Sequence, residues 1–179
     1  GHLSVLLPIY AAAELFRDHP YGRPDGGSER SLAQITHADV TEYYREHFGA
    51  DRLILAVTGD FDARAMRRAL EKTFGDWPRA AVPAPAAPRP VPVSGRRVLL
   101  VDAPSSVQTY FSIGNVGVAR NDPRRAPLDV VNTLFGGRFT SMLNSELRVR
   151  TGLTYGARSQ LARLTQPGSW QMRAFTQAQ

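Results

Sequence analysis

The sequence predicts an α+β fold in which helices pack on mostly antiparallel sheets, and three observations support this. After residue 96 the segments read as two strands, two helices and two strands, the order of a sheet with helices layered on it. Before residue 80 the order is helix, helix, strand, helix. Five prolines between residues 82 and 92 separate the two halves. We therefore expect parts of two α/β domains.

The first half is predicted to hold three helices and one strand. An Ala-rich segment at 8–17 favours a helix that ends before a His-Pro pair. A second helix begins after Thr36, whose hydroxyl and the Asp39 carboxyl form a capping box. The uninterrupted apolar run 53–57 predicts a strand buried on both faces. Asp62 could cap the third helix.

The proline-rich segment, residues 81–95, is predicted to be an extended interdomain linker. Prolines alternating with Ala and Val fix φ and favour a polyproline II conformation that buries little. We expect residues 1–80 to be the C-terminal part of a first domain and residues 96–179 the N-terminal part of a second. The alternative, a long loop inside one domain, is disfavoured by its length.

The second half supplies the strands and helices of the predicted second sheet. Pro123 fits the first turn of one helix, and Gly152 fits the end of another. The predicted strands are 98–101, 107–113, 154–164 and 169–175, and the predicted helices begin at 123 and span 139–150.

Composition and charge exclude several classes of protein. The chain has 179 residues, no cysteine and a net charge of +6, so disulfides and thiolate metal sites are excluded. No apolar run is long enough to span a membrane, and we expect a soluble bacterial protein of the cytoplasm or periplasm. The net charge is −3 over residues 1–78, +4 over 79–137 and +5 over 138–179. A nucleic-acid-binding function would need a binding motif, and the sequence has none.

The sequence contains none of the common motifs of zinc hydrolases, serine hydrolases or nucleotide-phosphate hydrolases. The four histidines, at positions 2, 19, 37 and 47, include no pair four residues apart with a Glu between them. His37 and His47 lie on different turns of one predicted helix, so the pattern favours exposed helix residues over zinc ligands. There is no Gly-x-Ser-x-Gly elbow and no phosphate-binding loop.

One pair of side chains is suited to bind a peptide. Arg148 lies near the end of a predicted helix, and Tyr155 opens the strand beyond Gly152. A guanidinium and a phenol hydroxyl on the same rim could donate hydrogen bonds to a peptide carbonyl or a developing oxyanion. The alternative is a surface Arg and a half-buried strand Tyr.

Several blocks, in order, resemble the M16 zinc metallopeptidases, the insulinase-like, pitrilysin-like and processing-peptidase-like family. They cover nearly the whole chain outside the linker. In the first half they are His19–Pro24, Ile35–Val40, Tyr43-Tyr44, Val57–Phe61 and Phe74–Pro78. In the second half they are Arg120–Pro123, Asn132–Gly137, Phe139–Asn144, Glu146–Arg148 and Gly152–Gly156.

The resemblance implies a fold of repeated M16-type α/β domains, related to metallohydrolases, that enclose a peptide. It implies a zinc site of the form His-x-x-Glu-His with a further Glu, in which zinc-bound water attacks and the Glu of the motif acts as base. It also implies that Arg148 and Tyr155 hold the substrate near the scissile bond. The zinc motif is absent from this sequence, and the further Glu is not assigned to Glu14.

We therefore expect a segment of an M16 zinc endopeptidase that supplies the Arg/Tyr side of the active site, with zinc in the parent protein and none in this chain. By itself it would be inactive. The alternative is part of a non-catalytic M16-like subunit that pairs with a zinc-bearing partner or acts as a scaffold. Open sheet edges predict that the chain pairs with the missing domain halves, a second copy of itself or another subunit. We also expect it to bind a peptide substrate.

Overall fold

The computed structural model describes residues 3–177, which form two compact units. One unit combines residues 3–26 with residues 87–177, and the other holds residues 27–86. The division differs from the boundaries predicted at 81–95, because the N-terminal helix belongs with the chain that follows the prolines. The predicted boundaries concern the domains of a complete protein, and they stay a prediction.

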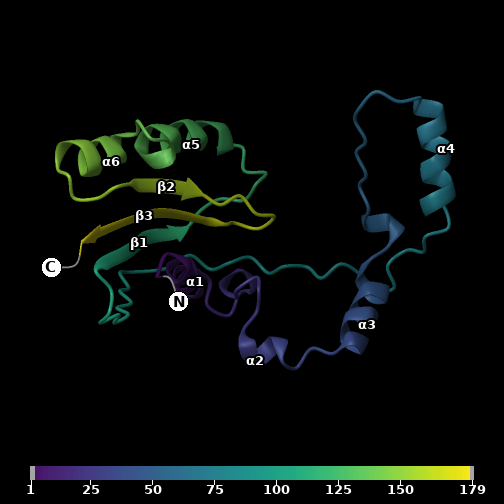
Figure 1. Ribbon diagram of the computed structural model, residues 1–179, viewed down its shortest axis with the longest axis horizontal. Coiled ribbons are helices and arrows are strands. Elements are labelled where there is room, and N and C mark those ends of the chain that lie inside the picture. Colours follow the sequence, from purple (N-terminus) through teal and green to yellow (C-terminus); the bar gives the residue numbers. More distant parts are fainter. Residues whose placement is uncertain (1–2, 178–179) are drawn as a thin grey trace. The chain divides into compact units, whose positions relative to one another are not determined.

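The first unit is built on a three-stranded antiparallel sheet (Figure 1). Its strands are β1 (Gln108–Val116), β2 (Ala157–Leu161) and β3 (Ser169–Gln177), in the order β1-β3-β2. Ala174 of β3 lies opposite Phe111 of β1 and Ala157 of β2. Since alternate residues of a strand face opposite sides, these three side chains share one face of the sheet.

Helical segments cover the β2 side of that face. They are α5 (Arg125–Asn132), the π-helical turn η3 (Thr133–Gly137), α6 (Met142–Asn144) and the π-helical segment η4 (Ser145–Arg150). Gly136 permits the close approach, because a Cβ there would lie 2.6 Å from the backbone nitrogen of Ser159. Asn132 fixes the contact by accepting hydrogen bonds from the Ser159 hydroxyl (2.8 Å) and the Trp170 indole (3.2 Å).

The N-terminal helix α1 (Leu3–Phe16) contacts β1, and the short helix η1 (Pro20–Gly22) follows it (Figure 1). Arg97 donates a hydrogen bond to the Glu14 carbonyl (2.7 Å) and also pairs with the Glu14 carboxylate (3.6 Å). These contacts connect segments that are far apart in the sequence, and they make α1 part of this unit.

The second unit contains α2 (Glu29–Leu32), α3 (His37–His47), η2 (Ala50–Arg52) and α4 (Ala63–Phe74). The predicted caps are present. Thr36 and Asp39 form the capping box, and the Asp62 carboxylate accepts from the Ala65 amide (2.6 Å). Arg52 donates to the carbonyls of His47 (2.7 Å) and Val82, which ties the end of α3 to the chain that returns after α4.

Two predicted strands are not formed in the described part of the chain. Residues 53–57 and 98–101 pair with no strand among residues 3–177, and Ile54 and Leu100 are 95% and 87% exposed. Both runs have the apolar composition of a buried strand, but a strand also needs a neighbour to complete its hydrogen bonds. The strand predictions were therefore wrong for this structure, while α5, β1, β2 and β3 match their predicted places.

Within residues 3–177, no helix combines the length and the apolar character needed to cross a membrane.

Candidate functional site

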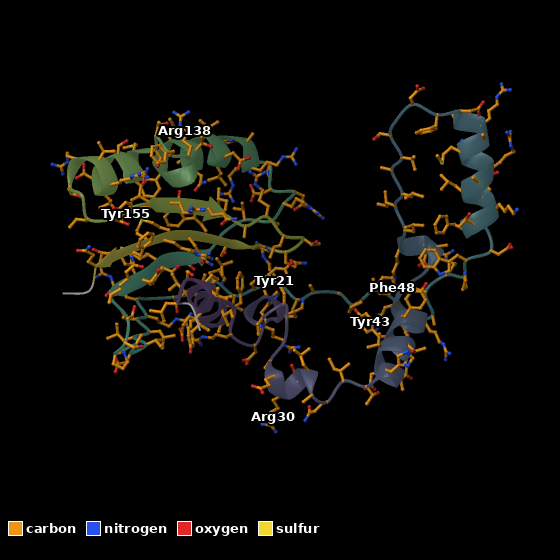
Figure 2. All side chains as sticks on the ribbon, viewed as in Figure 1. Tyr21, Arg30, Tyr43, Phe48, Arg138 and Tyr155 are labelled. Carbon is orange, nitrogen blue, oxygen red and sulfur yellow. The ribbon has the colours of Figure 1, made fainter. Side chains whose placement is uncertain are left out.

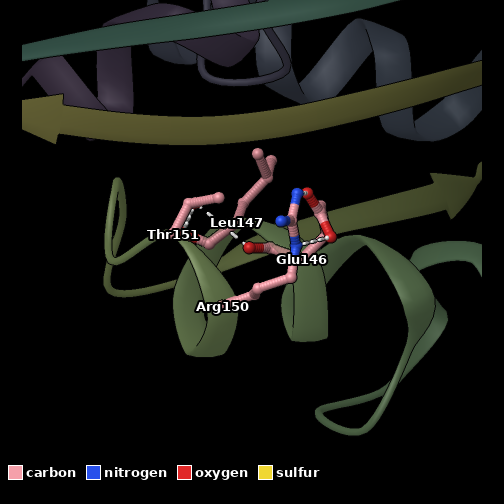
Figure 3. A network of polar contacts seen from close by, with 4 residues as sticks. All are labelled: Glu146, Leu147, Arg150 and Thr151. Carbon is pink, nitrogen blue, oxygen red and sulfur yellow. Dashed lines mark hydrogen bonds and ion pairs between the residues drawn. The ribbon is translucent and has the colours of Figure 1, made fainter.

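Of the predicted site residues, Arg148 lies in η4 and Tyr155 lies on the connection between η4 and β2. Backbone bonds of a widened turn and the Thr151 side chain shape the start of this connection (Figure 3). The Thr151 amide donates to the Glu146 carbonyl (3.0 Å), five residues back, and the Leu153 amide donates to the Leu147 carbonyl (2.9 Å). The Thr151 hydroxyl adds bonds of 3.1 Å to both carbonyls. Such π-helical turns occur frequently at functional sites.

Gly152 reverses the chain direction after η4. Its φ of +66° lies in the left-handed region, which side chains with a Cβ disfavour. The predicted helix end at Gly152 is thus explained by its backbone conformation, and Arg148 and Tyr155 lie on opposite sides of this turn.

Arg148 is half-buried and lies over an aromatic ring. Its guanidinium carbon is 4.6 Å from the centre of the Phe139 ring, a cation–π contact that positions the charge without neutralising it. Arg148 forms no ion pair within the described residues. Its guanidinium can therefore still donate hydrogen bonds to a ligand.

Arg150, two residues further on, is arranged differently. It forms a bidentate pair with Glu146, with one Nε–Oε2 distance of 2.6 Å (Figure 3). The hydrogen bond from Arg150 lowers the pKa of the Glu146 carboxyl, and the same bond raises the pKa of Arg150. Arg150 is thus engaged within its own helix, while Arg148 is not.

Tyr155 is 79% exposed and lies in the loop that leads into β2 (Figure 2). Its neighbours hold the backbone, since the Thr154 hydroxyl donates to the Gly156 carbonyl (3.0 Å) and accepts from the Gly156 amide (3.1 Å). The half-buried strand Tyr of the alternative interpretation is not what the structure contains. No hydrogen bond joins Tyr155 to Arg148 among the described residues.

The histidines do not gather into a metal site in the described structure. His37 and His47 occupy the two ends of α3, and the His47 ring packs on Tyr43 at 4.3 Å. His19 is buried and hydrogen-bonded through both ring nitrogens. His2 lies outside the described residues. Within residues 3–177 no three His, Cys, Asp or Glu side chains are placed to hold a metal, so these residues do not fit a zinc site and we assign them no zinc-dependent step.

Sequence reasoning assigned no role in the site to Phe139 or Asn144, although both lie in the block Phe139–Asn144 that resembles the M16 family. Phe139 places its ring under Arg148, and Asn144 is 3% exposed with its side-chain amide bonded to the backbone of Phe139 and of Ala157. A polar Asn beside Leu143 and Leu147 of the predicted helix was the available signal, because a buried amide needs partners.

Comparison with known proteins agrees with this architecture. The family model described as "Peptidase M16 inactive domain" matches residues 34–179. The chain belongs to the M16 peptidase family. This confirms the resemblance and the α+β fold of helices on an antiparallel sheet that the sequence predicted. The crystal structure of a peptidase M16 inactive domain from Pseudomonas fluorescens has a TM-score of 0.85 and 25% identity, over 97% of this chain and 42% of that one.

Two curated relatives show what this family includes. An uncharacterized zinc protease of Streptomyces coelicolor is 33% identical over 153 residues, which are 83% of this chain and 33% of the relative. The beta subunit of the mitochondrial-processing peptidase of Saccharomyces cerevisiae is 29% identical over 110 residues, 60% of this chain and 24% of that subunit. The chain thus matches about a third or less of the length of these two relatives.

Proposed function

We propose that this chain is the part of an M16 zinc endopeptidase that presents Arg148 and Tyr155 to the peptide, while the zinc site lies in another part of the protein. The observation that carries the proposal is the helix–turn–strand connection. It exposes the Tyr155 hydroxyl and leaves the Arg148 guanidinium without an internal carboxylate among the described residues. Both groups can then donate hydrogen bonds to a substrate carbonyl whose oxygen becomes negative during hydrolysis.

The rest of the proposal concerns what surrounds this chain. The zinc-protease names of the relatives support zinc in the parent protein, and the described residues supply no ligand set for it. Exposed apolar side chains such as Ile54 and Leu100 support burial against the remaining domains, a second copy or a second subunit. A processing-peptidase subunit among the relatives supports the paired-subunit arrangement.

The alternative is a non-catalytic M16-like subunit that lends Arg148 and Tyr155 to a zinc-bearing partner or serves as a scaffold. The two differ in what the full-length protein does alone. An endopeptidase binds zinc and cleaves peptides by itself, whereas a subunit of this kind binds no zinc and supports cleavage only when its zinc-bearing partner is added.

The test is peptide hydrolysis by the full-length protein and two variants. We expect Arg148→Ala to lower kcat/KM by about 100-fold and Tyr155→Phe by about 10- to 100-fold, because each removes a donor to the developing negative charge. Arg150→Ala is the matched control. It removes an arginine of the same helix that is bonded to Glu146, and we expect it to change kcat/KM less than about threefold.

The result can contradict the proposal in two ways. If Arg148→Ala and Tyr155→Phe were as active as Arg150→Ala, the proposal that Arg148 and Tyr155 bind the substrate carbonyl would be wrong. A full-length protein without zinc that cleaves peptides only in the presence of another subunit would favour the alternative.

A further inference from the structure

Asn144 is the buried residue that connects the two halves of the candidate site. It is 3% exposed and is the last residue of α6, directly before η4. Its side-chain amide nitrogen donates to the Phe139 carbonyl (2.7 Å), and its side-chain oxygen accepts from the Ala157 amide (3.2 Å). Both polar atoms of the amide are therefore used, as burial requires.

The two bonds reach the supports of different site residues. Phe139 carries the ring on which the Arg148 guanidinium rests at 4.6 Å. Ala157 is the first residue of β2, two residues after Tyr155, and it is 5% exposed. One side chain thus holds the backbone of the residue whose ring lies beneath Arg148 and the strand end beside Tyr155.

Local contacts alone do not fix this arrangement. Tyr155 lies after the Gly152 turn, in a loop whose first two residues donate to the Leu147 carbonyl and whose Thr154 side chain bonds Gly156, so these bonds hold the loop to η4 but not to Phe139. Phe139 is itself exposed, and it precedes α6. Without Asn144, the Phe139 and Ala157 backbone groups would lose the buried partner that they share, and the Arg148-to-Tyr155 spacing would be less restricted.

We propose that Asn144 is the positioning residue that sets the spacing of Arg148 and Tyr155 for one peptide carbonyl. The proposal rests on the function proposed above. Asn144 does not touch the substrate. It acts through Phe139 and Ala157, so its loss misplaces two donors together, and small misplacements of positioned groups are costly to rate.

Asn132 provides a matched control. Its side chain also joins a helix to the same face of the sheet, through Ser159 and Trp170, but it does not contact the Arg148–Tyr155 connection. Asn132→Ala therefore reports the general cost of losing a polar tie between helix and sheet. Asn144→Ala reports that cost together with any effect on the site.

The experiment measures kcat, KM and the urea midpoint of the full-length protein for both variants. We expect both to lower the urea midpoint, but only Asn144→Ala to lower kcat/KM, by about 10- to 100-fold and mainly through kcat. In a protein that already carries Arg148→Ala and Tyr155→Phe, Asn144→Ala should cause no further loss, because the groups it positions are gone. An equal effect of the two Asn variants, or an additive loss in that background, would overturn the proposal.

Two further measurements keep the proposal testable. If Asn144→Ala does not fold, Asn144→Asp replaces it, since it keeps the acceptor for Ala157 and removes the donor to Phe139.

If Arg148→Ala and Tyr155→Phe leave hydrolysis unchanged, the proposed function fails, and amide hydrogen exchange then tests the positioning role of Asn144 separately. We expect exchange at residues 153–157 to speed up in Asn144→Ala and not in Asn132→Ala. Unchanged exchange there would overturn the positioning role as well.

Discussion

His19 holds the N-terminal segment against the proline-rich chain through both nitrogens of its ring. Nδ1 accepts from the Tyr21 amide (3.1 Å), and Nε2 lies 2.7 Å from the Pro88 carbonyl, which it can reach only as a donor. The ring also packs against Phe16 and Tyr21, with centroids 5.9 and 4.6 Å away. This buried imidazole therefore joins segments that are 69 residues apart.

We predict that His19→Ala lowers the free energy of unfolding by about 1–3 kcal/mol, because it leaves the Pro88 carbonyl without this partner and opens a gap beside Phe16. Urea denaturation of the purified protein measures the change. His37→Ala is the control, since His37 is exposed at the start of α3, and its effect should stay within about 0.5 kcal/mol. Equal effects of the two substitutions would contradict the role of His19.

Residue-scale features were predictable where the partners are close in sequence. Thr36 and Asp39 are three residues apart and Asp62 caps the helix that follows it, so residue type and spacing determine these caps. Asn144 and Ala157 are 13 residues apart, with a π-helical segment and a left-handed turn between them. Their contact depends on how the chain turns, which local spacing does not encode.

At the scale of elements, β2 and β3 place two like charges side by side. Arg158 lies directly opposite Arg173, and no ion pair involves either of them within the described residues. Arg173 donates both its Nε (3.1 Å) and Nη2 (2.7 Å) hydrogens to the Gln171 side-chain oxygen. Burial, followed by the nearby charge of Arg158, lowers the pKa of Arg173.

We predict that Arg158→Glu stabilises the sheet by about 0.2–1 kcal/mol, because it replaces cross-strand repulsion with attraction. Arg158→Gln removes the repulsion alone and should give a smaller gain. The urea midpoint at low and high salt measures both, and the gain should shrink at about 1 M salt, where charges are screened. The control is Arg163→Gln. Arg163 is exposed, follows the end of β2 by two residues and pairs with Asp129, so this substitution should not stabilise the protein. A loss of stability in Arg158→Glu would contradict the prediction that Arg158 and Arg173 repel each other across the strands.

The type of an element was predictable where its hydrogen-bonding partners lie in the same helix or in neighbouring strands of the chain. The segments β1, β2 and β3 alternate or carry β-formers, and they find one another within the chain. Residues 53–57 and 98–101 are more uniformly apolar than these strands but have no pairing strand in the described structure. Composition indicates that a segment can be buried, whereas pairing depends on which neighbours are present.

At the scale of the whole molecule, the order of motifs predicted the family to which the chain belongs. The blocks before and after the prolines predicted the M16 family, and the family model, which matches residues 34–179, includes the prolines and every block except His19–Pro24. The domain boundaries predicted around residues 81–95 stay a prediction, and the sequence did not indicate that Glu14 and His19 contact Arg97 and Pro88. Long-range contacts of this kind leave no signature in local composition.

Four carboxyls with lowered pKa values are spread over both units, and they connect stability to pH. Hydrogen bonds from Thr36 lower the pKa of Asp39, and the Ala80 amide lowers the pKa of Asp51. Arg124 lowers the pKa of Asp122, and Arg150 lowers that of Glu146. A lowered folded-state pKa means that the native state binds protons less readily than the unfolded chain.

We therefore predict that stability from these groups is fully present above the usual carboxyl pKa of about 4 and is lost as the pH falls through their lowered values. In a series of urea denaturations from pH 6 to pH 2.5, the midpoint urea concentration should decrease once the pH is below about 4. High salt should weaken the contributions of Asp122 and Glu146, which are bonded to arginines, more than those of Asp39 and Asp51, which accept from hydroxyl or backbone groups. A midpoint that stays level or rises in acid would contradict this, since these carboxylates would then have no stronger partners in the folded state than in the unfolded chain.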